Sequence, residues 1–232
     1  MVIEESANLR LNKHLALCLG ISRRQADNLI DQQKVTINGQ TATLGARFNE
    51  GDTITVDGKD IVGKTEYQYI ALNKPFGYVC SRKQQGDSPT IYELLPSIYH
   101  NLKTVGRLDR NSTGIILLTN DGDFAYQMTH PSQYKVKVYQ VHLNHDLEPL
   151  HQQMISDHGV TLEDGPSKLQ LERMDDTSRK DWIVTMHEGR NRQIRRTFES
   201  LGYNVQKLHR TNFGNYALGD IKSGEFNVIE QR

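Results

Sequence analysis

The sequence predicts an α+β protein of two domains, a small one near the N-terminus and a larger one after it. Residues 9–60 combine two helical patterns with short alternating strands. Residues 68–232 combine several strand patterns with isolated short helices. The polar, glycine-containing stretch 61–67 is predicted to be the linker between them. With 232 residues, the chain is long enough to bury a core in each domain.

The composition is that of a globular protein, with 36% hydrophobic and 24% charged residues. The formal net charge of +0 excludes a uniformly basic surface but allows one basic face. Cys18 falls in a helical pattern and Cys80 in a strand pattern, which favours neither a disulfide framework nor a zinc site. No apolar run approaches membrane-spanning length, and the N-terminus has no signal-peptide pattern. We therefore expect a soluble, cytoplasmic protein.

The small domain begins with two helices. Leu11 and Leu15 share one helical face with Cys18, and a second helix begins at Ser22, which can form a capping box with Gln25. The first turn of that second helix carries the pair Arg23-Arg24. Helix amides and arginines together can bind phosphate, although two solvated arginines would give the same pattern.

A small sheet follows these helices. Residues 34–37 alternate as a strand, Asn38-Gly39 predicts a type I′ hairpin, and residues 40–43 return. Residues 53–58 form a last short strand.

The larger domain opens with a strand at 67–72, a break at 73–77 and a resumed strand at 78–81. Lys74 precedes a Pro-x-Gly turn, which would present a cation on a rigid corner or leave it solvated. Residues 82–88 form a polar loop, and a short helix ends at Pro96.

A glycine-flanked loop at 106–114 carries the strongest chemical signal, reading G-R-L-D-R-N-S-T-G. Asp109 lies between Arg107 and Arg110, and the apolar run 115–118 follows as a buried strand. Because neighbouring cations keep a carboxylate ionised, Asp109 can act as a nucleophile or a base. The alternative is an ordinary polar loop.

The strand pattern at 135–143 follows a short helix that Asp121 can cap. Its alternation places Tyr139 on one face with Lys135 and Lys137. Such a tyrosine can stack on a base beside phosphate-binding lysines, or it can belong to the core.

The segment H-E-G-R-N-R-Q-I-R-R-T-F-E-S-L-G-Y predicts a helix capped by Asn191. Arg195 lies at the edge of its buried face, where it can bind a carboxylate in a bidentate manner or pair with Glu199. Four arginines in seven residues suit a polyanion: Arg190, Arg192, Arg195 and Arg196.

The small domain resembles the S4 RNA-binding domain in L-R-L-N-K-H-L-A, S-R-R-Q-A, V-T-I-N-G and E-G-D-T-I-T-V. This resemblance implies that Arg23, Arg24 and Lys34 face structured RNA.

The larger domain resembles the RsuA/RluB/RluF family of ribosomal-RNA pseudouridine synthases. The motifs are G-R-L-D-R-N-S-T-G-I-I-L-L-T-N-D-G, K-V-Y at 137–139, E-G-R-N-R-Q-I-R-R, K-P-F-G-Y-V-C-S and L-H-R-T-N-F-G. The resemblance implies a mixed, mainly antiparallel sheet with flanking helices. One departure is K-V-K-V-Y, where many members carry a more acidic stretch.

The resemblance also assigns roles. Asp109 would be the catalytic aspartate, Tyr139 the ring stacked on the uracil, and Arg195 the partner that holds Asp109. Arg107 would enter the RNA beside the extruded nucleotide, and Leu208 would help to complete the base pocket. The remaining RNA contacts would come from Lys74, Arg190, Arg192 and Arg196.

The predicted function is isomerisation of one uridine in ribosomal RNA or an assembly intermediate, by a monomer that needs no metal and no cofactor. The wording N-R-Q-I-R-R favours 23S over 16S rRNA. The competing hypotheses are a non-catalytic rRNA-binding factor and a hydrolytic enzyme on RNA. The second is disfavoured because the histidines show no metal-ligand spacing.

Overall fold

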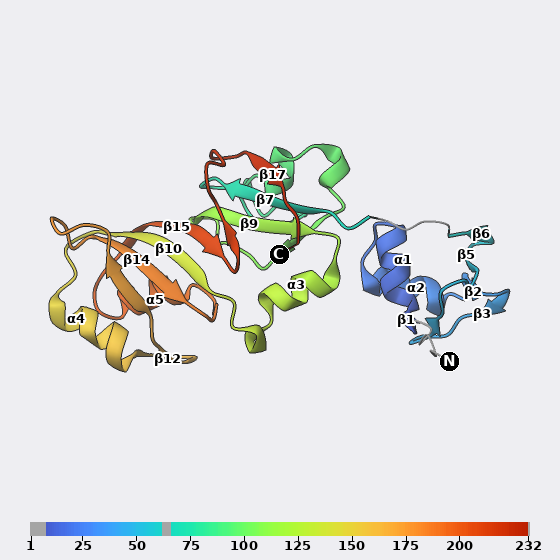
Figure 1. Cartoon of the computed structure of the whole chain (residues 1–232), viewed down its shortest axis with the longest axis horizontal. Coiled ribbons are helices and arrows are strands. Elements are labelled where there is room, and N and C mark those ends of the chain that lie inside the picture. The colour runs from blue at the N-terminus through green and yellow to red at the C-terminus, as the bar shows by residue number, and fades with distance from the viewer. Residues whose placement is uncertain (1–7, 62–65, 232) are drawn as a thin grey trace, which may run out of the picture. The chain divides into compact units, whose positions relative to one another are not determined.

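The chain divides into two units, Met1–Tyr67 and Gln68–Arg232, in the computed structural model shown in Figure 1. The structure describes residues 8–61 and 66–231. Residues 62–65 of the predicted linker, and the first seven residues that lack a signal-peptide pattern, lie outside the described residues. Within the described ranges no helix is long and apolar enough to cross a membrane.

The first unit packs two helices against a small antiparallel sheet of strand order β3-β2-β5-β6, while β1 pairs with β4. Leu11 and Leu15 share its core with Ile30, Val35 and Ile54, which confirms the predicted face at the two leucines. Cys18, predicted on the same face, is only half-buried and lies outside this core. Its elements are β1 (Leu9–Arg10), α1 (Leu11–Cys18), α2 (Arg23–Asp31), β2 (Val35–Ile37), β3 (Gln40–Thr41), β4 (Arg47–Phe48), β5 (Ile54–Val56) and β6 (Lys59–Asp60).

Two local signals of the first unit are formed as predicted. Ser22 and Gln25 make the reciprocal hydrogen bonds of a capping box at the start of α2. Asn38 and Gly39 both have positive φ, 51° and 79°, which is the backbone of a type I′ hairpin turn.

The second unit is built on a mixed sheet of nine strands within the described residues, mainly antiparallel. Its main path runs β13-β14-β10-β15-β9-β7-β17, and only β15 and β9 pair in parallel. The elements are β7 (Tyr69–Lys74), β8 (Lys103–Val105), β9 (Thr113–Thr119), α3 (Gly122–Thr129), β10 (Lys137–Leu143), α4 (Pro149–Gln153), β11 (Val160–Leu162), β12 (Gly165–Ser167), β13 (Gln170–Arg173), β14 (Asp181–Met186), α5 (Gln193–Glu199), β15 (Val205–Phe213), β16 (Tyr216–Ala217) and β17 (Phe226–Val228), with 3₁₀ turns at Ile91–Leu94, Ser97–Tyr99 and Pro131–Gln133 and a π turn at Met154–His158.

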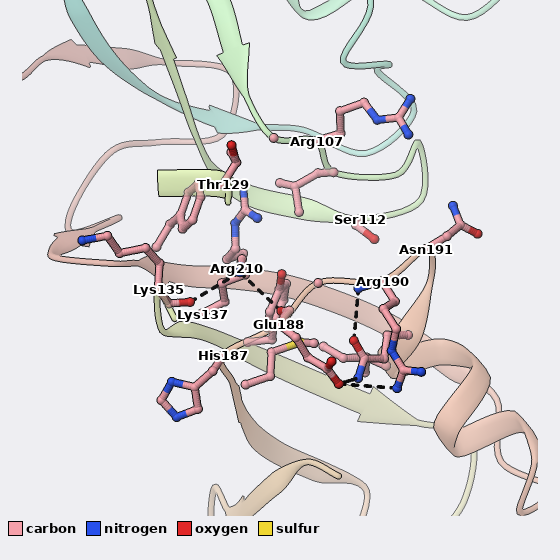
Figure 2. A pocket seen from close by; sticks show the side chains of 18 of the residues that line it. Arg107, Ser112, Thr129, Lys135, Lys137, His187, Glu188, Arg190, Asn191 and Arg210 are labelled. Atoms are coloured by element: carbon pink, nitrogen blue, oxygen red, sulfur yellow. Dashed lines mark hydrogen bonds and ion pairs between the residues drawn. The ribbon is translucent and has the colours of Figure 1, made fainter. Parts of the chain in front are cut away.

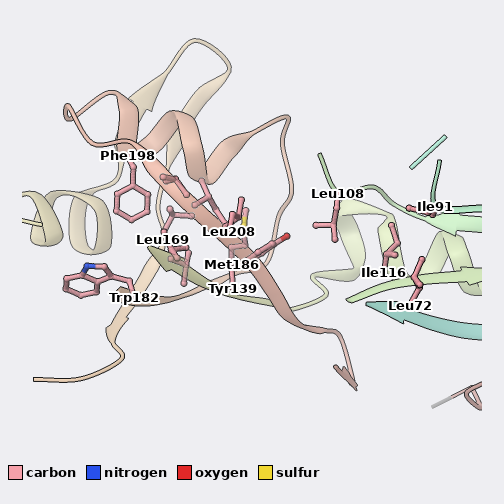
Figure 3. Packing of buried hydrophobic residues seen from close by; sticks show 14 of the residues in the cluster. Leu72, Ile91, Leu108, Ile116, Tyr139, Leu169, Trp182, Met186, Phe198 and Leu208 are labelled. Carbon is pink, nitrogen blue, oxygen red and sulfur yellow. The ribbon is translucent and has the colours of Figure 1, made fainter. Parts of the chain in front are cut away.

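Both faces of this sheet are covered near its centre. Ile116 and Leu118 of β9 belong to one hydrophobic cluster, whereas Ile115 and Leu117 belong to another, which contains Phe124 of α3. A strand buried on both sides reads as a continuous apolar run, which explains the sequence I-I-L-L. Figure 3 shows residues of the first cluster, among them Tyr139, Met186 and Leu208.

The parallel pairing of β9 with β15 depends on Gly114. Its φ is +103°, and a Cβ atom there would lie 2.2 Å from the carbonyl oxygen of Arg210. Only glycine allows so close a backbone approach at a positive φ. This contact places Arg210 beside the strand that follows the 106–112 loop.

Three local predictions were wrong. Strand β7 continues to Lys74 instead of breaking at Asn73, since the Asn73 side chain donates to the carbonyl of Ile221 (2.7 Å). The predicted strand 78–81 is reduced to a single bridge from Val79 to Thr90. Asn191 does not cap α5, because Arg192 occupies the N-cap in a left-handed conformation without a side-chain cap.

Candidate active site

A cavity of about 470 Å³ lies in the second unit, within the size range of small-ligand pockets. Segments far apart in sequence line it (Figure 2): the 106–112 loop, the end of α3 with the turn after it, β10, residues 186–194 and β15. The sheet therefore brings together the three predicted motifs, which carry Asp109, Tyr139 and the arginines near α5.

Asp109 lines the cavity from the loop between β8 and β9. Its side chain is 37% exposed, so a ligand can reach the carboxylate. The loop is fixed by backbone hydrogen bonds, from the Ser112 amide to the Asp109 carbonyl (3.0 Å) and from the Gly77 amide to the Arg110 carbonyl (3.0 Å). The carboxylate is thus presented by an ordered turn.

Lys74 holds this loop from inside the protein and does not face RNA, which corrects its predicted role. The residue is 0% exposed, and its Nζ donates to the carbonyls of Ser112 (2.7 Å) and Pro75 (3.0 Å). Burial lowers the pKa of Lys74 to about 8, an effect that nearby Cys80 and Asp109 partly oppose. A lysine surrounded by carbonyls in the interior cannot also contact a polyanion.

Arg192 is the arginine that approaches Asp109, with 3.9 Å between its Nη1 and Oδ2 of the aspartate. Its φ is 47°, in the left-handed region that non-glycine residues seldom adopt. Such backbone strain concentrates at functional sites. The ion pair is open, because the Arg192 side chain is 44% exposed.

Arg195 does not hold Asp109 directly, which corrects the bidentate contact predicted for this pair. Its Nη1 donates to the carbonyl of Val205 (2.6 Å) and its Nη2 to that of Asn111 (2.8 Å). The two guanidinium nitrogens that would bind a carboxylate in a bidentate manner are thus both engaged by backbone carbonyls. Burial lowers the pKa of Arg195 and Arg192 adds to this, while Asp109 opposes it. Arg195 therefore holds the 106–112 loop in place through the carbonyl of Asn111.

Tyr139 is both a core residue and a wall of the cavity. It is 7% exposed and belongs to the same cluster as Leu108 and Leu208, which also line the cavity (Figure 3). The face of β10 predicted for it is buried, since Val141 and Leu143 share it. The two interpretations of this tyrosine are therefore compatible.

Arg210 was not singled out from the sequence as a site residue, but it lines the cavity. It is 3% exposed, donates from Nε to the Ile115 carbonyl (2.9 Å), and places Cζ 4.7 Å from the ring centre of Phe213. It is the cross-strand neighbour of Tyr139. The available signal was its position two residues after Leu208, on the same face of a strand.

Arg190 and Arg196 are engaged within the protein, by contacts that compete with their predicted contacts to RNA. Both pair with Asp164, at 2.9 Å and 2.7 Å. Arg190 also donates to the carbonyls of Gly165 and Pro166, at the start of β12. The hydrogen bond with Arg196 is the main cause that lowers the pKa of Asp164.

Five of the predicted RNA-binding cations remain exposed. They are Arg107 and Arg192, which also line the cavity, and Arg23, Arg24 and Lys34 on the first unit. Arg23 makes one hydrogen bond, from Nη2 to Oδ1 of Asn12 (3.3 Å). Across residues 8–61 and 66–231, no group of three or more His, Cys, Asp or Glu side chains is placed to hold a metal ion.

A family model described as RNA pseudouridylate synthase matches residues 68–200, more than half of the chain. The chain belongs to the RNA pseudouridylate synthase family. A second model, the S4 domain, matches residues 9–54. The predicted family and the predicted S4 unit are both confirmed.

Relatives of this pseudouridine synthase carry names from both ribosomal subunits. The ribosomal small subunit pseudouridine synthase A of Pasteurella multocida is 37% identical over 227 residues, covering 95% of this chain and 96% of that protein. The ribosomal large subunit pseudouridine synthase B of Bacillus subtilis is 34% identical over 221 residues, covering 93% and 90%. The large subunit enzyme B of Xylella fastidiosa is 38% identical over 221 residues, but this chain spans only 46% of its length.

The fold is also that of a solved pseudouridylate synthase. Its crystal structure matches with a TM-score of 0.68 and 34% identity, covering 96% of each chain. The predicted α+β fold, with an S4 domain followed by a mixed, mainly antiparallel sheet, is therefore confirmed, as is the enzyme class.

Proposed function

We propose that this pseudouridine synthase isomerises one uridine of ribosomal RNA, with Asp109 as the group that reacts with the nucleotide. The observation that carries the proposal is the position of Asp109, on a fixed loop at the wall of the cavity that Tyr139 also lines. The rRNA enzymes named above, at 34–38% identity, support ribosomal RNA as the substrate class.

The reaction breaks the N1–C1′ bond of uridine and joins C1′ to C5, while a proton leaves C5 and N1 gains one. An ionised carboxylate can serve it by attacking the nucleotide or by removing a sugar proton. Arg192 places its guanidinium 3.9 Å from the Asp109 carboxylate, at the wall of the same cavity. Tyr139, Leu108 and Leu208 offer an aromatic and apolar surface for the detached uracil.

Extrusion of the uridine from its helix must precede this chemistry, because a stacked base cannot reach a cavity. Arg107 is exposed and lines the same cavity, so it is placed to fill the gap that the nucleotide leaves. Arg23, Arg24 and Lys34 give the S4 unit cations for the RNA backbone. We further propose that the protein is a cytoplasmic monomer that acts on rRNA or an assembly intermediate. We propose 23S rRNA as its substrate in preference to 16S rRNA.

The test is carbodiimide mapping of pseudouridine in rRNA incubated with wild type and with Asp109→Asn. We expect a stop at one uridine with wild type and none with the variant, since the amide can neither attack nor take a proton. Asp220→Asn, at an exposed site outside the cavity, is the matched control and should retain the stop. If no rRNA or assembly intermediate gives a stop and both proteins bind RNA equally, the non-catalytic factor replaces the enzyme.

A further inference from the structure

The wall of the cavity has an apolar part and a cationic part. The apolar side chains are those of Leu108, Tyr139, Met186, Ile194 and Leu208. The cationic part contains Lys135, Lys137 and Arg210, which Figure 2 shows close together. A nucleotide is divided in the same way, into a flat base and a phosphodiester anion.

The guanidinium of Arg210 is buried but only partly satisfied. Its Nε donates to the Ile115 carbonyl, whereas its Nη2 is inaccessible to solvent and has no hydrogen-bond partner. The group lies between the rings of Phe213 (4.7 Å) and Tyr139 (6.0 Å). A buried charge without a counter-charge is costly, and Arg210 lines the cavity, so an anion bound there would stabilise this guanidinium through its charge.

Lys137 adds a second cation to the same part of the wall. Its Nζ makes two long contacts, with the carbonyls of Glu188 (3.3 Å) and Lys135 (3.4 Å). Burial lowers the pKa of Lys137, and the charge of Arg210 lowers it further, while Glu188 opposes both. Two cations that line the same cavity and repel each other create a positive potential there, which attracts an anion.

No carboxylate of the described chain pairs with these two cations. The Glu188 carboxylate instead accepts hydrogen bonds from Gln193 and from Arg190 (3.4 Å). Asp109, the aspartate of the cavity, pairs with Arg192. The two cations are therefore free to pair with an anionic ligand.

We propose that Lys137 and Arg210 form a subsite for one backbone phosphate of the RNA strand that carries the target uridine. A phosphodiester supplies a full negative charge beside both cations, and its oxygens can accept from the Lys137 ammonium in place of the two long contacts. The apolar part of the wall then holds the uracil beside Tyr139. This inference rests on the proposed function, because it takes an RNA strand as the occupant of the cavity.

The test couples a change in the protein with a change in the RNA. Oligonucleotides around the mapped uridine carry a neutral methylphosphonate at one phosphate at a time, and their affinities are measured by fluorescence anisotropy. We expect one position to weaken binding to wild type by about tenfold or more, the worth of a charge-assisted hydrogen bond. The same replacement should lower the affinity of Lys137→Met for the oligonucleotide by less than about twofold, because the side chain that contacts this phosphate is already absent.

A second readout needs no mapped uridine. On whole rRNA, the slope of log affinity against log salt should fall by about one for Lys137→Met, because one phosphate contact is lost. Lys168→Met, at an exposed site outside the cavity, should leave the slope unchanged. Because this measures binding and not turnover, a failed isomerase assay and a failed subsite give different results.

Arg210 is tested by a charge-conserving variant, since Arg210→Met would leave the Ile115 carbonyl without its donor. Arg210→Lys should reduce the methylphosphonate effect at the same phosphate as Lys137→Met does. The subsite is refuted if no phosphate position couples to either residue. It is also refuted if Lys137→Met lowers turnover without any such coupling. That result would mean that the two cations contact the uracil base and not a phosphate.

Discussion

Helices α2 and α5 carry the same pattern in sequence, with arginines clustered at the N-terminus, yet they use them differently. Arg23 and Arg24 of α2 are exposed, with one long hydrogen bond between Arg23 and Asn12. Around the start of α5, Arg195 is held by two carbonyls and Arg196 by Asp164. Only Arg192 stays exposed there, beside Asp109.

The difference shows that a count of arginines does not measure an RNA-binding surface. A guanidinium has five donors, and acceptors of the same protein take them when the fold brings them within reach. Near α5 those acceptors are Asp164 and the carbonyls of Asn111 and Val205. The predicted basic stripe is therefore largely part of the scaffold of the site, while that of α2 remains available.

The largest effect that would sharpen this comparison is expected from Arg195→Met. It leaves two carbonyls without their donor and releases the Asp109 loop at Asn111. The free energy of unfolding in urea should fall by about 2–4 kcal/mol, and pseudouridine formation should fall with it. Arg195→Lys, which can keep one of the two bonds, should recover part of both. Unchanged stability of the methionine variant would mean that Arg195 does not brace the loop.

Removal of the α2 arginines should act on RNA binding alone. For the double variant Arg23→Ala, Arg24→Ala, we expect the slope of log affinity for rRNA against log salt to fall by about 1.5. Two phosphate contacts are lost, and each contributes about 0.7 on a single strand and about 0.9 on a duplex. Stability should stay within about 0.5 kcal/mol of wild type, as at other exposed sites. Arg196→Ala is the matched variant on α5 and should leave the slope unchanged. An equal loss of slope there would break the comparison.

The N-termini of the two helices should also differ in their capping. Ser22→Ala removes the side chain that accepts from the Gln25 amide (3.2 Å) and should cost about 1 kcal/mol of stability. Asn191→Ala should cost less than about 0.5 kcal/mol, because Asn191 caps nothing with its side chain. Urea unfolding of both variants checks this, and a larger loss for Asn191→Ala would reverse the assignment of the α5 cap.

The smallest effect concerns the pair of arginines on Asp164, which lowers the pKa of that carboxyl. A carboxyl with a lowered pKa in the folded state stabilises the fold above its unfolded pKa of 3.8. This contribution is lost as the pH falls through the lower folded value. Asp164→Asn should therefore be slightly less stable than wild type at pH 7 and equally stable in strong acid. A stability difference that persists in acid would point to packing instead of charge.

The elements that could be predicted from the sequence depend on neighbours along the chain. The capping box at Ser22, the Asn38-Gly39 turn and the cap of α3 by Asp121 are all present, since each closes within a few residues. The same local reasoning failed at Asn191, because the chain at Arg192 adopts a left-handed turn that no spacing reveals. It also failed at Lys74, whose acceptor on Ser112 lies 38 residues away.

The sequence by itself determined the two α+β units, their hydrophobic faces and the three motifs that carry Asp109, Tyr139 and the arginines near α5. Only the tertiary structure decided which cation serves which acceptor. Arg195 contacts a carbonyl 84 residues away, Arg196 an aspartate 32 residues away, and Arg210 a carbonyl 95 residues away. Periodicity and capping report interactions within a few residues, whereas a guanidinium pairs with whichever acceptor the sheet brings within about 3 Å. The strand register that sets this distance comes from the whole core.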